Sequence, residues 1–188
     1  RWLFARMEIG IKSEPKEYVP VKLNVNVAEF NGECSPDIQL ALEDDILDVT
    51  GKVTVQNMDA EIKATELSAA AFVPESVANP TIFVRTDLDV MLGQHVSLAL
   101  DPLLRCVFVP QTPFTIRMDQ SENTFAVKGD IQLRSGDVAY LNRSFYLKQG
   151  LIKFNDTAET FDPCITVRAE TRERDEDGDE VRIILSAE

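Results

Sequence analysis

Apolar and polar residues alternate with a period of two along most of this chain, and that alternation constrains its fold more than any other feature. In the stretch FAVKGDIQLR, residues 125–134, every second residue is apolar or glycine, and the residues between them are almost all polar or charged. Successive side chains of a β-strand point to opposite faces of the sheet, so such a segment predicts a strand with one apolar face. About a dozen segments, spread from end to end of the chain, repeat the pattern.

Residues that favour turns lie between the alternating segments. The nine prolines mostly separate them, and Asn31-Gly32 and Asp177-Gly178 are dipeptides typical of tight hairpins. No segment has a convincing helical period, and only residues 64–73 are rich in helix-forming residues without a clear periodicity. The sequence therefore predicts an all-β fold built as a long antiparallel meander.

Two glycines occupy positions where the alternation calls for an apolar side chain. They are Gly51 in LDVTGKV and Gly129 in FAVKGDI. A glycine inside a strand marks a bend, a bulge or the close approach of another segment. The apolar phase also shifts across Gln149-Gly150, which predicts a β-bulge at that point.

Charge and length narrow the class of protein. The 188 residues carry 19 Lys and Arg against 32 Asp and Glu, a net charge of −13. Such a chain repels a phosphate backbone, so we expect no nucleic-acid binding. No run of about 18 apolar residues is present, so no transmembrane helix is expected. The chain begins inside a patterned segment without an initiator Met, and we expect residues 1–188 to be a single domain-like piece of a longer protein.

Residues that usually carry catalysis or bind metals are sparse. His95 is the only histidine, and its context GQHVS predicts a turn that leads into a strand. The three cysteines are far apart and form no CxxC pair, which leaves a zinc site unsupported. The acidic segment 173–180 lacks the glycine and glutamate positions of a calcium loop and is typical of a charged hairpin tip. We therefore expect no catalytic residue, no metal and no cofactor, and a hydrolase that uses carboxylates alone is disfavoured.

A sheet with one apolar face must cover that face. It can close on itself as a sandwich or small barrel, face lipid as an outer-membrane barrel, or curl into an open trough that holds an apolar ligand. One Trp and three Tyr are too few for the aromatic girdles of a membrane barrel, which makes that solution the weakest. The alternation itself does not separate the sandwich from the trough.

The segment from Val127 to Glu170 resembles the C-terminal domain of the TamB family, in the AsmA-like group of bridge-type lipid transfer proteins. The stretch YLNRSF is similar to a spirochaete-type version of the family. The best match is to residues 120–188. The residues that carry the resemblance are Gly129, Gly136, Phe145, Leu147, Gly150, Ile152, Phe154, Asp162, Pro163, Ala169 and Glu170.

The resemblance implies a fold and a function. The fold is a β-taco, a long antiparallel sheet curled into a U with an apolar interior. The function is phospholipid transport through the periplasm from inner to outer membrane, with a supporting role in outer-membrane assembly. Family members are anchored in the inner membrane by an N-terminal helix and act with a TamA-like barrel protein. The chain ends at ILSAE, before the tail that reaches toward that partner, so any such docking is expected to use parts outside it.

On this interpretation the alternating apolar side chains line a groove for acyl chains. The alternative is a closed β-sandwich that acts as a protein-interaction scaffold in envelope assembly, with the same residues as its core. The expected lining is Val21, Leu23, Val25, Val27, Val49, Val53, Val55, Val84, Leu88, Val90, Phe114, Ile116, Phe125, Val127, Ile131, Leu133, Phe145, Leu147, Ile152, Phe154, Ile165, Val167, Val181 and Ile183.

Overall fold

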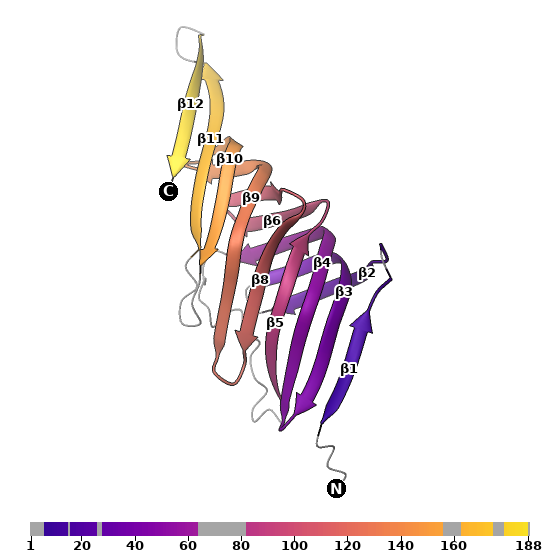
Figure 1. Cartoon of the computed structure of the whole chain (residues 1–188). Helices are drawn as coiled ribbons and strands as arrows, with labels where there is room; N and C mark the ends of the chain where they lie inside the picture. Colours follow the sequence, from indigo (N-terminus) through magenta and orange to yellow (C-terminus); the bar gives the residue numbers. More distant parts are fainter. Residues whose placement is uncertain are drawn as a thin grey trace.

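The described part of the chain forms one large β-sheet. A computed structural model describes residues 6–14, 16–25, 28–63, 82–155, 163–174 and 179–187. Within these residues every regular element is a strand, and all twelve strands join a single sheet (Figure 1). This confirms the predicted all-β class.

The strands are of unequal length, and the longest are about three times the length of the shortest. Their bounds are β1 (Met7–Lys12), β2 (Val19–Val25), β3 (Ala28–Glu43), β4 (Ile46–Lys63), β5 (Phe83–Leu92), β6 (Val96–Asp101), β7 (Leu104–Phe108), β8 (Thr112–Asp119), β9 (Thr124–Tyr140), β10 (Arg143–Asn155), β11 (Cys164–Arg174) and β12 (Glu180–Ala187).

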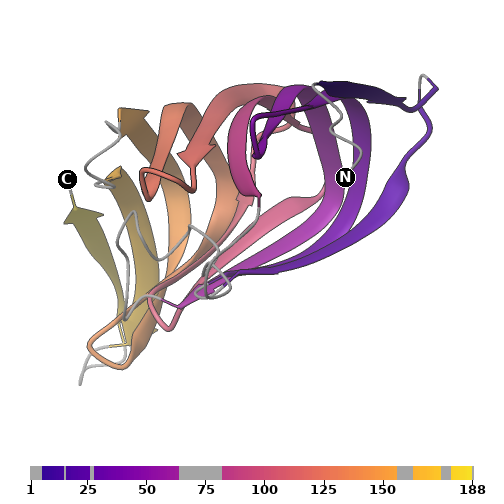
Figure 2. The ribbon, with the colours of Figure 1, turned by 90° about the horizontal axis from the view of Figure 1, so that it is seen from below.

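Short strands lie end to end along the long ones. Both β1 and β2 pair with β3, both β5 and β6 pair with β4, and both β7 and β8 pair with β9. The long strands curve, so that the sheet folds back on itself as a U (Figure 2). We call the part with β1, β5 and β8 wall 1, and the part with β2, β6, β7 and β12 wall 2.

The two walls meet along a crease, which we define by residues 93–95 between β5 and β6 and residues 109–111 between β7 and β8. Backbone hydrogen bonds continue the sheet through it. The Gly93 amide donates to the Val55 carbonyl at 2.6 Å, and the Met58 amide donates to the His95 carbonyl at 3.1 Å. His95 has a φ of 54° and directly precedes β6, in agreement with its predicted place before a strand.

Strand register places most of the apolar strand residues on one face of the sheet. Directly paired residues share a face; one such row runs Ile9, Leu40, Val49, Thr86, Met118 and Phe125. This inner face comprises the odd-numbered residues of β1, β2, β11 and β12 and the even-numbered residues of β3 and β5–β8. Three strands change parity along their length. The inner residues of β4 are odd-numbered up to 55 and even-numbered from 58. Those of β9 are odd-numbered up to 133 and even-numbered from 136, and those of β10 are odd-numbered up to 147 and even-numbered from 150.

Side chains from both walls pack together beside the crease. The buried cluster is Met58, Leu92, Val96, Leu104, Cys106, Phe108, Ile131, Leu133, Leu147, Ile152 and Val167. Partly buried neighbours from both walls pack against it, among them Phe30, Leu100, Phe114 and Phe154. Among the described residues, no large side chain is less than 2% exposed, so this core is thin.

Two details differ from the sequence-based expectation. The strand pairs β4–β5 and β4–β6 are parallel, whereas an antiparallel meander was predicted. Parallel neighbouring strands need a connection of a dozen residues or more. The segment between Lys63, the end of β4, and Phe83, the start of β5, is long enough for that. Asn31-Gly32 lies inside β3 at a register shift rather than in a hairpin, because the β3–β4 ladder continues past it. Residues 64–73 and Asp177-Gly178, for which a short helix and a hairpin turn were considered, lie outside the described residues.

The structure confirms the predicted roles of the two glycines and the bulge. Gly51 has a φ of +133° and Gly129 a φ of +143°. A Cβ on Gly51 would collide with the carbonyl oxygen of Asp37 and lie 2.8 Å from the Cα of Ile38, and one on Gly129 would lie 2.9 Å from the Cβ of Phe114. The β10–β11 ladder shifts register between Leu147 and Gln149, where the bulge was predicted.

The three cysteines are free and differ in environment. Cys106 is buried, Cys34 is half-buried and Cys164 is exposed. Burial raises the pKa of the Cys106 thiol to about 12, and it also raises the pKa of Cys34. Because the thiolate is the reactive form, the raised pKa of Cys106 lowers its reactivity, and its burial also keeps reagents away from it.

Replacing Gly51 by Ala should destabilise the sheet, because the new methyl group meets the backbone of β3 and because the backbone conformation suits glycine. We expect a loss of roughly 2–4 kcal/mol in the free energy of unfolding, measured by urea denaturation. Gly10→Ala is the matched control, since nothing lies within 4 Å of a Cβ at Gly10. Equal unfolding midpoints for the two variants would contradict the close approach.

Thiol labelling at pH 8 should distinguish the cysteines. Cys164 is expected to react with a maleimide in the native protein, while Cys106 should react only after unfolding, as read by peptide mass spectrometry. Rapid native labelling of Cys106 would show that the cluster beside the crease opens readily.

Candidate functional site

The inner face is the candidate functional surface, because its burial is uneven. Near the crease its side chains are covered, with Leu92 at 3% and Ile152 at 2% exposure. Toward the first edge of the sheet Ile9 is 44% and Leu23 51% exposed, and toward the last edge Val181 is 41% exposed. The apolar surface is therefore continuous from edge to edge, and it is exposed at both edges.

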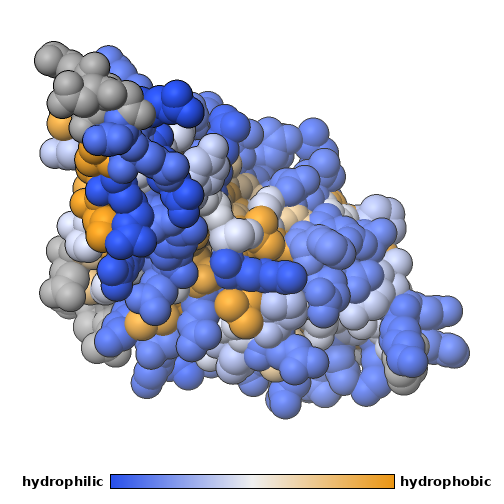
Figure 3. All heavy atoms as spheres, turned by 90° about the horizontal axis from the view of Figure 1, so that it is seen from above, coloured by the Kyte–Doolittle hydropathy of each residue, from blue (hydrophilic) through white to orange (hydrophobic). Residues whose placement is uncertain are grey.

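The space-filling view agrees with this distribution. Seen from above, hydrophobic residues gather near the centre of the view and along its left side, with hydrophilic residues around them (Figure 3). Exposed contiguous apolar surface on a folded protein usually marks a place where something apolar binds.

Strand register places the predicted lining residues with described side chains on this inner face. Ten belong to or pack against the buried cluster: Val21, Val55, Phe114, Ile131, Leu133, Leu147, Ile152, Phe154, Ile165 and Val167. Val90, Val127 and Phe145 are buried outside it. Val49, Val53, Val84, Leu88, Ile116, Phe125 and Ile183 are half-buried, and Leu23 and Val181 are exposed. Val27 and the side chain of Val25 lie outside what the structure describes.

The predicted set omitted several residues of the buried cluster. Met58 was missed because Asn57, with a φ of 46°, shifts the alternation of β4 by one residue. The cluster residues of β7 were missed because that strand is short. Val96 follows the alternation of VSLAL, residues 96–100, but was left out of the predicted lining.

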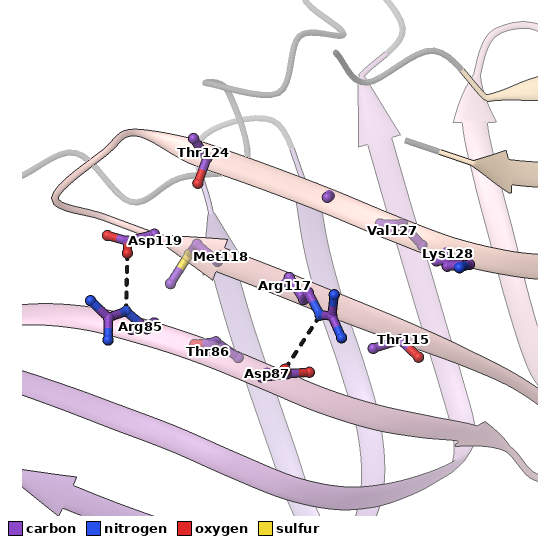
Figure 4. A pocket seen from close by; sticks show the side chains of 11 residues that line it. Arg85, Thr86, Asp87, Thr115, Arg117, Met118, Asp119, Thr124, Val127 and Lys128 are labelled. Atoms are coloured by element: carbon purple, nitrogen blue, oxygen red, sulfur yellow. Dashed lines mark hydrogen bonds and ion pairs between the residues drawn. The ribbon is translucent and has the colours of Figure 1, made fainter. Parts of the chain in front are cut away.

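The outer face of the sheet carries the opposite chemistry. A hollow of about 490 Å³ lies mainly over the polar phase of β5, β8 and β9 (Figure 4). Its charges pair across strands: Arg85 Nε lies 3.0 Å from Asp119 Oδ2 and Arg117 Nε 3.3 Å from Asp87 Oδ2. The Ser121 hydroxyl donates to Asp119 Oδ1 at 2.6 Å and, together with the Arg85 guanidinium, lowers the pKa of the Asp119 carboxyl. Four of the hollow's charged side chains are therefore paired with one another across the strands.

A second outer hollow, of about 520 Å³, lies near the bulge of β10. Polar side chains of Gln132, Lys148, Thr166, Arg168 and Ser186 contribute to it. Lys148 donates to Glu170 at 2.9 Å and lowers the pKa of that carboxyl. Both hollows lie mainly on the face opposite the apolar one.

Metal and membrane-spanning features can be assessed only within the described ranges. There, no group of three or more His, Cys, Asp or Glu side chains is placed to hold a metal ion. The described part also contains no helix with the length and apolar character to cross a bilayer. Of the acidic segment 173–180, residues 175–178 lie outside the described set, and the flanking strands pair antiparallel up to Arg174 opposite Glu180.

Comparison with known proteins agrees with this architecture. No curated protein matches the chain. A family model, the TamB C-terminal domain, matches residues 22–188, so the match extends well upstream of the segment whose residues suggested it. That family is a non-enzymatic module of the cell envelope with a role in outer-membrane assembly. Because the match covers most of its length, the chain belongs to the TamB C-terminal domain family.

Proposed function

We propose that the inner face is a groove for phospholipid acyl chains and that the chain is a periplasmic segment of a conduit between the inner and outer membranes. The observation that carries this proposal is the apolar face that runs from β1 and β2 to β12 and is exposed at both edges. A closed core would bury those side chains. A conduit needs them accessible at both edges, where further segments of the parent protein would continue the apolar face.

The energetics of an apolar lining suit transport. Each methylene group that leaves water for such a surface gains about 0.8 kcal/mol, so acyl chains bind without any specific polar contact. Val, Ile, Leu and Phe recur along the whole face, which provides similar binding at each strand and no single deep minimum. A lipid can therefore move across the strands at low cost.

The packed cluster beside the crease defines where a lipid can lie. Ile131, Leu133 and Ile152 are buried by other side chains and hold the two walls together. The acyl chains would occupy the space farther from the crease, against half-buried residues such as Leu88 and Ile116 in wall 1 and Ile62 in wall 2. In this arrangement the cluster forms the floor of the groove.

The remaining parts of the proposal concern the parent protein. It would be anchored in the inner membrane, and a TamA-like outer-membrane barrel would bind through parts outside this chain. Neither role needs a cofactor or a catalytic group.

A closed sandwich that acts as a protein-interaction scaffold is the second candidate. The observation in its favour is the same cluster, because side chains from both walls already meet in it. The two candidates differ in what covers the half-buried residues, lipid or another protein.

Adjacent isoleucines in β12 provide a test. Ile183 lies on the inner face and Ile184 on the outer face, where it is 45% exposed. We expect native mass spectrometry of the purified chain to detect bound phospholipid, Ile183→Glu to reduce it severalfold, and Ile184→Glu to leave it unchanged. The reason is that a carboxylate in the lining must lose its hydration when a lipid binds.

Circular dichroism of both variants controls for folding. A wild-type protein that carries no phospholipid after purification and after incubation with lipid would contradict the groove and support the scaffold. Equal lipid capture by the two variants would place the lipid elsewhere than on the inner face.

A further inference from the structure

The inner face is almost free of charge. Among its described positions the polar residues are Thr86, Thr112, Tyr140 and Thr171, and the charged residues are Arg143 and Glu173 alone. Charged side chains are otherwise abundant and occupy the outer face, edges and turns. These two opposite charges lie side by side on an otherwise apolar surface, and their presence there needs an explanation.

Arg143 and Glu173 form an ion pair at the free rim of wall 2. Arg143 Nη1 lies 2.7 Å from Glu173 Oε2, and the two side chains are 48% and 39% exposed. Arg143 is paired with Tyr140 of β9, and Glu173 with Val181 of β12. These four residues form a row across β9, β10, β11 and β12, which we call the rim row.

The row below, nearer the crease, is largely apolar. It consists of Val138, Phe145, Thr171 and Ile183, and Phe145 is only 4% exposed. A step of two residues along each strand therefore passes from an exposed row with two charges to a less exposed row with none. An amphiphile with a charged head and apolar tails matches that step.

Stability alone gives a weak reason for this pair. Exposed ion pairs contribute little to folding, and the chain has others on its outer face, such as Arg117 with Asp87. An apolar pair at these two positions would extend the lining by one row. The pair instead presents a guanidinium and a carboxylate to whatever occupies the groove.

We propose that the rim row binds the headgroup of a zwitterionic phospholipid, an inference that rests on the proposed function of the inner face. The Arg143 guanidinium donates to the phosphate oxygens, for which its planar set of N–H groups is well suited. The Glu173 carboxylate accepts from the headgroup amine, and the Tyr140 ring borders the site. The acyl chains then lie against the half-buried Val138 and Ile183 of the next row.

The carboxylate gives the site its selectivity. A phosphate that lacks a nearby cation would face Glu173 across a few ångströms and be repelled by it, whereas a zwitterionic headgroup satisfies both charges. The structure thus predicts preference for an amine-bearing phospholipid over an anionic one.

The test uses the 188-residue chain and three probes with identical acyl chains: phosphatidylethanolamine, phosphatidylglycerol and diacylglycerol, supplied in equal amounts in detergent micelles. Native mass spectrometry reads the bound fractions. We expect the wild type to retain phosphatidylethanolamine about fivefold over phosphatidylglycerol. Arg143→Gln should lower phosphatidylethanolamine capture about tenfold and leave diacylglycerol unchanged, and Glu173→Gln should raise the share of phosphatidylglycerol.

Arg117→Gln is the matched control, since it breaks a similar ion pair on the outer face, and it should change no ratio. If Arg143→Gln proves unfolded by circular dichroism, Arg143→Lys replaces it and should give an intermediate loss. Equal capture of all three probes by the wild type, or unchanged ratios in both rim variants, would overturn the headgroup site while leaving the groove intact. Failure to retain diacylglycerol as well would overturn the groove itself.

Discussion

The structure depends on one constraint: a single sheet with a continuous apolar face must cover that face with itself. No helix or second sheet is present among the described residues to do so. The sheet meets the constraint by curling, and side chains from both walls bury one another beside the crease. Because curling covers the centre better than the ends, the same interaction that holds the walls together leaves apolar surface at both edges.

Local irregularities in three of the long strands accompany the curling of the sheet. Each of the long strands β4, β9 and β10 changes the parity of its inner residues once, at Asn57, between Leu133 and Gly136, and at Lys148. An extra residue in a strand bends it and increases its twist, and it also reverses the alternation that follows. The sequences reverse their polar pattern at the same points, so the apolar face stays continuous through the bend. Gly51 and Gly129 allow neighbouring strands to approach closely where a side chain would separate them.

This design links fold and proposed function. In the proposed function, the same uniform apolar lining that holds the walls together near the crease would present a surface to lipid farther out. The rim row interrupts that uniformity at one place, with Arg143 and Glu173 opposite each other. A site that selects a headgroup at the rim can act without creating a deep minimum for the acyl chains below it.

The sequence by itself determined the features that depend on neighbouring residues. Alternation predicted the strands and their two faces, the phase shift predicted the bulge of β10, and the residues around Gly129 and Gly150 indicated the family. These were readable because side-chain direction in a strand follows from local geometry. Only the tertiary structure decided which strands pair, that β4 runs parallel to β5 and β6, and that Asn31-Gly32 lies within a strand rather than in a hairpin. It also decided which apolar residues are packed and which are exposed, and that Arg143 meets Glu173. Those outcomes depend on contacts between segments far apart in the chain, and alternation is the same for a strand at the centre of a sheet as for one at its edge.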